Sequence, residues 1–177
     1  MRPGLGLLCV GALSWLVVDG VSLLSPAETV SGFAALSDGL SLLSLAGHLA
    51  VGAGAGLLLR HRAAPFGLAL LCAVGWCVGW LLWRTGTGTL PLHPDLIAFV
   101  EVTALCVGLL RWVFGARRAL LAAAALLSLT PFAATIAQAG GTAVSTTAYF
   151  GGQLLGGMAL LAALAIALRH PEDTPTA

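Results

Sequence analysis

The sequence predicts an all-α integral membrane protein, a bundle of six transmembrane helices, and two observations carry that prediction. Of the 177 residues, 59% are hydrophobic and only 8% are charged, whereas a soluble domain carries about a quarter charged residues. Apolar stretches of about 20 residues, long enough to cross a hydrocarbon core of about 30 Å, recur along the chain. This composition excludes a soluble enzyme, a nucleic-acid binder and a disordered chain.

Six stretches meet the length requirement, and they are separated by connectors rich in Pro, Gly and Ser. They cover approximately 3–24, 37–59, 65–83, 95–114, 116–138 and 148–168. The first stretch follows Arg2 and has a cleaved signal peptide as its alternative, but no Ala-x-Ala site follows it, so an uncleaved helix is expected. The polar segment 169–177 is expected to form a short tail.

The basic residues predict the orientation of these helices. All eight are Arg, and threading six spans from a cytoplasmic N-terminus places only Arg84 on the outer side. The cytoplasmic side then receives Arg2, Arg60, Arg62, Arg111, Arg117, Arg118 and Arg169. Because Arg is enriched in cytoplasmic loops, both termini are expected in the cytoplasm, with the protein in the cell's inner membrane and the tail 169–177 on the same side.

Polar residues inside a membrane span are costly unless they are paired or face water, so they mark candidate sites. The stretch 37–59 carries a polar stripe at steps of three and four residues. Its members are Ser37, Ser41, Ser44, His48 and Gly52. At 100° per residue they share one narrow face, which should point into the bundle. His48 then either accepts a proton or binds a cation, or only bridges two helices through a hydrogen bond.

Glu101 is the strongest functional candidate, because it lies about 9 Å inside the fourth span at 1.5 Å per residue. It must face a cavity or a partner if it is ionised. The alternative is a protonated carboxyl group that forms a hydrogen bond with a neighbouring Ser or Gln. Arg111 lies nearly three turns away on the same span and cannot pair with it directly.

The fifth span contains Pro131, which removes a hydrogen bond to the Leu127 carbonyl and predicts a kink. Ser128, Thr135 and Gln138 share a face with this proline. A kinked, hydroxyl-lined face is tolerated where neighbouring helices or water satisfy the freed carbonyl. Gln153, near the start of the last span, is a further candidate for the polar interior.

Acidic residues gather in the outer half of the predicted bundle. Besides Glu28 and Glu101, they are Asp19, Asp38 and Asp95. Only Arg84 opposes them there, so we expect an acidic outer vestibule that attracts cations. Sorting of Arg to the cytoplasmic side would by itself leave the same distribution of acids.

Small residues predict close helix packing and possible partners. Three Gly-x-x-x-Gly pairs, Gly52 with Gly56, Gly75 with Gly79, and Gly152 with Gly156, offer faces on which helix backbones can approach. Besides the lipid bilayer, the expected partner is therefore a second copy or a membrane complex. Trp76, Trp80 and Trp83 share one face and are interpreted as a packing stripe.

Enzymatic chemistry is not expected. The sequence contains no nucleophile elbow, zinc-protease motif, phosphate-binding loop or Cys-x-x-Cys pair. The four cysteines lie in apolar stretches and are interpreted as small hydrophobic side chains. Only His48 lies deep in a span, so paired haem ligands are lacking. No cofactor is therefore expected, and the sequence leaves open whether a metal binds.

The length, the six-span plan and several short strings resemble the HupE/UreJ family of hydrogenase and urease accessory proteins. The similar strings are Gly32-Phe33, Gly39-Leu40, Leu49-Ala50-Val51-Gly52, Leu90-Pro91, Gly108-Leu109-Leu110 and Ala148-Tyr149 with Gly151, together with the acids at Asp95 and Glu101. The resemblance implies a nickel permease. The sequence departs from the family's metal motifs: the expected histidines fall on Ala35 and Leu42, the expected aspartate falls on Ser41, and 130–140 contains no histidine.

Two functional hypotheses follow. The first is a small permease that moves a cation or small solute through an interior lined by the second, fourth and fifth spans. A substrate-binding component of a vitamin importer is a variant of it. The second is an accessory subunit of a membrane complex, without transport of its own. Whether His48 and Glu101 face one cavity distinguishes the two.

Overall fold

The computed structural model describes residues 2–24, 30–59, 64–88, 92–110, 112–142 and 145–169, with the backbone alone described at 30–37 and 146. The regular elements in this part of the chain are all helices, which confirms the predicted all-α class. They are α1 (Arg2–Leu24), α2 (Val30–Leu59), α3 (Ala64–Thr85), α4 (Pro94–Leu109), the short 3-10 helix η1 (Gly115–Arg117), α5 (Arg118–Leu127), α6 (Thr130–Ala139) and α7 (Thr146–Arg169).

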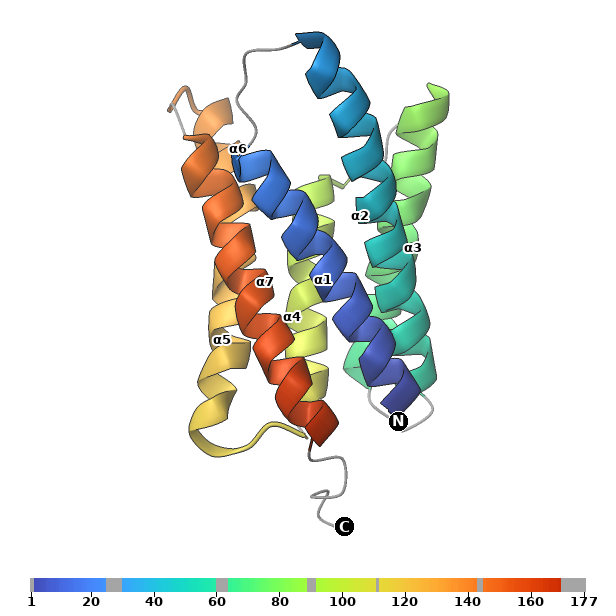
Figure 1. Ribbon diagram of the computed structural model, residues 1–177, viewed down its shortest axis with the longest axis vertical. Helices are drawn as coiled ribbons and strands as arrows, with labels where there is room; N and C mark the ends of the chain where they lie inside the picture. Colours follow the sequence, from blue (N-terminus) through green and yellow to red (C-terminus); the bar gives the residue numbers. More distant parts are fainter. Residues whose placement is uncertain are drawn as a thin grey trace.

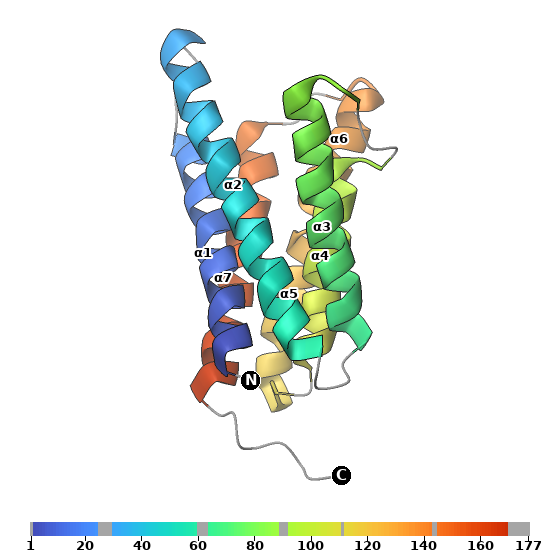
Figure 2. The same cartoon turned by 90° about the vertical axis from the view of Figure 1, so that its right-hand side faces the viewer.

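The helices run alternately up and down and form a closed ring (Figures 1 and 2). Each of α1 to α4 packs against the next, α5 packs against α4, and α7 packs against both α5 and α1. The short helices α5 and α6 follow one another as a single broken rod between α4 and α7. The start of α1 and the end of α7 therefore lie at the same end of the bundle (Figure 1).

Five helical segments in the described residues are long and apolar enough to cross a membrane. They are α1, the Asp38–Leu59 part of α2, α3, the stretch Gly115–Ala139 and α7. This supports a membrane-embedded protein. The remaining helix, α4, has 16 residues, or about 24 Å at 1.5 Å per residue, which is less than the hydrocarbon thickness.

The predicted fourth span, 95–114, was too long at its carboxyl end, because α4 stops at Leu109. The amides of Trp112 and Val113 both donate to the Leu109 carbonyl, and Gly115 follows with a positive φ of 60°. Trp112 and Val113 are almost fully buried. Hydropathy extended the predicted helix because this apolar turn packs into the core just as a helix would.

The predicted break in the fifth span is confirmed at Pro131. Helix α5 ends at Leu127, and α6 begins at Thr130 after a two-residue turn. Because Pro131 has no N–H, the Leu127 carbonyl lacks its usual helical partner, and the Thr130 hydroxyl donates to it instead. The freed carbonyl is thus satisfied by a neighbouring side chain, as a membrane interior requires.

Glycines allow close packing within the chain itself. The backbones of α1 and α2 approach closely: a Cβ at Gly54 would lie 2.7 Å from the Gly4 carbonyl oxygen, and one at Gly11 would lie 2.8 Å from the Gly47 carbonyl oxygen. This antiparallel pairing at a seven-residue spacing was not among the predicted motifs. It brings α1 against α2 along the half of the bundle that contains the N-terminus.

Two of the three predicted glycine pairs are also used inside the chain. A Cβ at Gly52 would lie 3.2 Å from the Cβ of Ala73 on α3, and one at Gly156 would lie 3.2 Å from the Cβ of Leu127 on α5. By contrast, a Cβ at Gly75 would meet nothing within 4 Å. Partner binding through the first two faces stays a prediction, but these faces already contact neighbouring helices.

Candidate functional site

The two strongest candidates from the sequence form a buried pair. His48 of α2 and Glu101 of α4 are joined by a hydrogen bond of 2.7 Å between Nδ1 and Oε2. His48 is 4% exposed and Glu101 is 0% exposed. The second carboxyl oxygen of Glu101, Oε1, is buried without a hydrogen-bond partner among the described residues. The pair therefore links two helices and keeps one polar atom unsatisfied.

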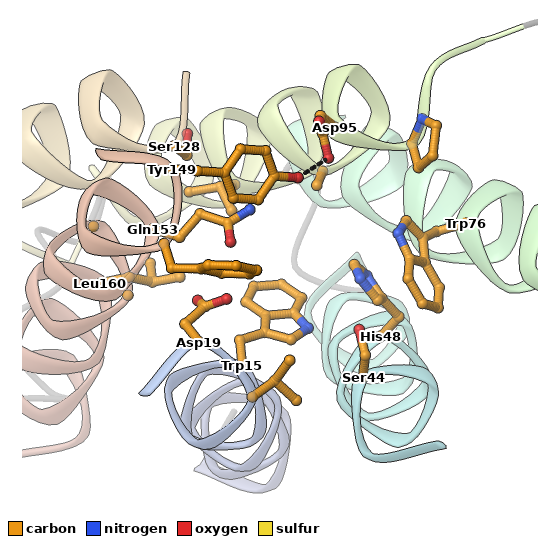
Figure 3. Close-up of a pocket in the computed structure, with 17 residues that line it drawn as sticks. Trp15, Asp19, Ser44, His48, Trp76, Asp95, Ser128, Tyr149, Gln153 and Leu160 are labelled. Atoms are coloured by element: carbon orange, nitrogen blue, oxygen red, sulfur yellow. Dashed lines mark hydrogen bonds between the residues drawn. The ribbon is translucent and has the colours of Figure 1, made fainter. Parts of the chain in front are cut away.

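Two tryptophans hold the imidazole ring of His48. Trp76 of α3 stacks on it at a centroid distance of 4.1 Å and an interplanar angle of 20°. Trp15 of α1 lies 4.9 Å away at 50°, and Figure 3 shows His48 between the two indoles. Helices α1 to α4 therefore meet at this ring, which fixes its position on two sides.

His48 lines a cavity of about 280 Å³ inside the ring of helices. The polar lining comes from five elements: Ser44 and His48 from α2, Asp19 from α1, Asp95 from α4, Ser128 from the turn after α5, and Tyr149 and Gln153 from α7 (Figure 3). Glu101 is not part of this lining, because it lies behind His48 with no exposed surface. His48 alone therefore connects the buried pair to the cavity.

Asp95 is held by two hydroxyl groups. Tyr149 donates to its Oδ1 and Thr135 donates to its Oδ2, each at 2.9 Å. His93, which caps the start of α4, has its Nδ1 3.6 Å from the same Oδ2. These contacts join α4, α6 and α7 at one corner of the cavity and satisfy this carboxylate.

Asp19 has a different environment. It is 9% exposed, lines the same cavity, and makes no hydrogen bond or ion pair with any residue in the part of the chain that the structure describes. In Figure 3 its carboxylate points toward the side of the cavity where Gln153 lies. A carboxylate in this position is available to a ligand.

The predicted site residues divide into those that meet at the cavity and those that do not. Two members of the polar stripe on α2, Ser44 and His48, line the cavity, and Leu42 and Leu49 are exposed on another face of the helix. Ser41 is half-buried and outside the cavity lining, and the side chain of Ser37 lies outside the described residues.

On the fifth span, the predicted polar face contributes unequally. Ser128 reaches the cavity directly, and Thr135 reaches it only through Asp95. Gln138 is exposed and does not line the cavity, because it lies near the end of α6, about two turns beyond Pro131. Gln153 lines the cavity from α7, as expected.

The predicted acidic vestibule includes Asp19 and Asp95 but not Asp38. Asp38 is exposed and forms an ion pair of 2.9 Å with Arg84, outside the cavity lining. Glu28 lies outside the described residues. Arg84 therefore pairs with the exposed Asp38, whereas the cavity lining contains the less exposed Asp19 and Asp95.

Sequence reasoning missed the aromatic part of the site. Trp15, Tyr149 and Phe150 all line the cavity, and Trp76, interpreted as part of a packing stripe, stacks on His48. One signal could have indicated Trp15: it lies four residues before Asp19, so both occupy one face of α1. Trp76, Trp80 and Trp83 also line a second, more apolar cavity of about 300 Å³ beside α4.

No group of three His, Cys, Asp or Glu side chains that could hold a metal ion occurs among the described residues. Comparison with protein-family models, curated proteins and solved structures finds no match for this chain.

Proposed function

We propose that this protein is a permease with six membrane spans that carries a cation or a small polar solute through the interior of its helix ring. One observation carries the proposal: a cavity lined by Asp19, Asp95 and His48 lies inside an otherwise apolar bundle. Acidic and imidazole groups are expensive within a membrane and are found there where a pathway or proton relay needs them.

In this proposal α4 also crosses the membrane, which brings the number of spans to six, and the apolar turn that follows it completes its short length. Under this proposal both termini lie in the cytoplasm and the bundle crosses the inner membrane, which the distribution of Arg along the sequence supports. With this orientation, the cavity lies in the outer half of the bundle. The HupE/UreJ resemblance agrees in size and span number, but the described residues offer no set of metal ligands, so the proposed cargo is not nickel.

The His48–Glu101 pair is proposed to couple movement of the solute to a change of protonation. Glu101 does not reach the cavity, and His48 does. A proton exchanged between Glu101 and the cavity therefore has to pass through the imidazole, which can hold it on either nitrogen. Such a step changes the charge of the cavity wall when a cation arrives or leaves.

The alternative is an accessory subunit that does not transport, and the packing of Glu101 favours it. Glu101 has no exposed surface and its partner is a helix neighbour, which also suits a purely structural bridge between α2 and α4. The two functions differ in what the loss of this carboxyl group should do.

The test is flux in proteoliposomes that contain the purified full chain and an internal pH-sensitive dye. Sodium, potassium, ammonium and methylammonium gradients are the probes. We expect flux of at least one probe. Glu101→Gln should reduce this flux about tenfold or more, because it keeps the shape of the side chain but removes the carboxyl group. Asp38→Asn is the matched control and should retain the parent rate, because Asp38 lies outside the cavity.

Flux of no probe through folded protein would support the accessory function. Flux that Glu101→Gln leaves unchanged would remove the buried pair from the mechanism. Both variants have to give a single monodisperse species with the parent's helix content, so that a loss of flux is not a loss of folding.

A further inference from the structure

The charged groups that line the cavity are predominantly acidic. Asp19 and Asp95 are its carboxylates, and none of the described arginines lines it. The chain contains no Lys. His48 is the other titratable group at the wall, apart from the Tyr149 phenol, and its Nδ1 already pairs with Glu101. A ligand that enters this space therefore meets negative charge without a nearby protein cation.

The two carboxylates differ in what they still need. Asp95 accepts a hydroxyl hydrogen bond at each oxygen, from Tyr149 and Thr135. Asp19 has no such partner among the described residues, although it is more than nine-tenths buried. A buried carboxylate without a partner is costly, and a ligand with a positive charge and N–H or polarised C–H groups would offset that cost.

The rest of the lining suits an organic cation better than a bare metal ion. Trp15, Trp76, Tyr149 and Phe150 contribute aromatic rings, and aromatic faces attract ammonium groups. Tyr149 and Phe150 are themselves arranged edge to face, with centroids 4.9 Å apart. A hard metal ion instead needs about six oxygen ligands at short range. The cavity volume of about 280 Å³ is near the lower limit for small-molecule pockets, which suits a small ligand.

We infer that this cavity binds a small organic monocation, a protonated or quaternary amine, with Asp19 as its counter-charge and the surrounding aromatic rings as its apolar walls. The inference names the substrate class of the proposed permease and rests on that function for its biological purpose. Binding itself can be measured without any transport.

The experiment measures binding to the purified full chain in detergent by titration calorimetry and tryptophan fluorescence. The probes are tetramethylammonium, choline and 3,3-dimethyl-1-butanol, a neutral compound of the same shape as choline. We expect the two cations to bind and the neutral compound to bind about tenfold more weakly or worse. Asp19→Asn should lower the affinity for choline by about tenfold or more, and Asp38→Asn should leave it unchanged.

Three outcomes would overturn the inference: equal binding of choline and its neutral counterpart, displacement of choline by stoichiometric sodium, or no binding of either cation to folded protein. Because the comparison of choline with its neutral counterpart uses the parent protein, it decides the question even if Asp19→Asn fails to fold. Binding of choline without flux of any solute would contradict the permease and leave the binding site standing. Flux without cation binding would do the reverse.

Discussion

At the scale of single residues, His48 and Glu101 explain each other. They are 53 positions apart in the chain, and each would be expensive in a bilayer by itself. Their contact removes part of that cost, while Oε1 of Glu101 has no hydrogen-bond partner among the described residues.

Removing one member of the pair should therefore cost more than removing both. His48→Leu leaves Glu101 buried without this partner, so we expect the free energy of unfolding to fall by about 2 kcal/mol. This magnitude lies between the loss of an intramembrane hydrogen bond and the loss of one partner of a buried ion pair in a soluble protein. The double variant His48→Leu with Glu101→Leu should recover at least half of this loss. Reversible unfolding in mixed detergent micelles gives the four free energies. Additive losses would contradict a direct coupling.

The sequence could identify these two residues but not their contact. A titratable side chain inside an apolar span stands out from composition alone, and helical spacing correctly placed His48 on an inward face. The contact depends on how far α2 and α4 slide along each other, which is set by packing of many apolar side chains. The unpartnered state of Asp19 and the approach of Trp15 to His48 depend on the same registers.

At the scale of helices, glycines set the distance between α1 and α2. Gly4 and Gly11 face Gly54 and Gly47, with room for no side chain between the backbones. Close approach replaces the hydrophobic drive that a bilayer does not supply. This contact positions Trp15 next to His48, and so helix packing at one end of the bundle supports the site near its middle.

Adding a single methyl group at this contact should destabilise the bundle. In Gly54→Ala the new Cβ would lie 2.7 Å from the Gly4 carbonyl oxygen and 3.0 Å from a Leu8 methyl group, so α1 must move, and we expect a loss of about 1 to 3 kcal/mol. Gly6→Ala is the matched control, because a Cβ there meets nothing within 4 Å and alanine favours the helix. The same unfolding measurement applies, and equal stabilities of the two variants would refute the role of this contact.

Helix ends were less predictable than helix existence, and the reason is physical. Hydropathy measures whether a residue prefers an apolar environment, and the buried turn at Trp112 and Val113 prefers it as much as α4 does. Proline acts through the backbone instead, so the break before Pro131 was visible in the sequence. The glycines of α1 and α2 that meet are seven residues apart in each helix, so the four-residue spacing of Gly-x-x-x-Gly does not predict this contact.

At the scale of the whole molecule, the arginines separate between the two ends of the bundle. The end of the bundle where α1 begins and α7 finishes carries Arg2, Arg117, Arg118 and Arg169. Arg84, near the carboxyl end of α3, lies at the opposite end of the bundle (Figure 1). Arg60, Arg62 and Arg111 lie outside the described residues. The same ring therefore places the acidic cavity lining nearer the end that carries Arg84, since Asp95 is at the start of α4 and Tyr149 is near the start of α7.

The last prediction is the sidedness of these ends. The Arg-rich side of a membrane protein is usually cytoplasmic. Reporters fused after Ala177 should therefore lie in the cytoplasm, and reporters inserted between Arg84 and Pro94 should lie on the outer side. The measurement is the activity of a periplasm-dependent phosphatase and a cytoplasm-dependent fluorescent protein at each position. Reporters on the same side would contradict α4 as a membrane span, because α4 to α7 cross an odd number of times only if it is one. An outer C-terminus would also reverse the orientation of the cavity, so that a solute would enter it from the cytoplasm.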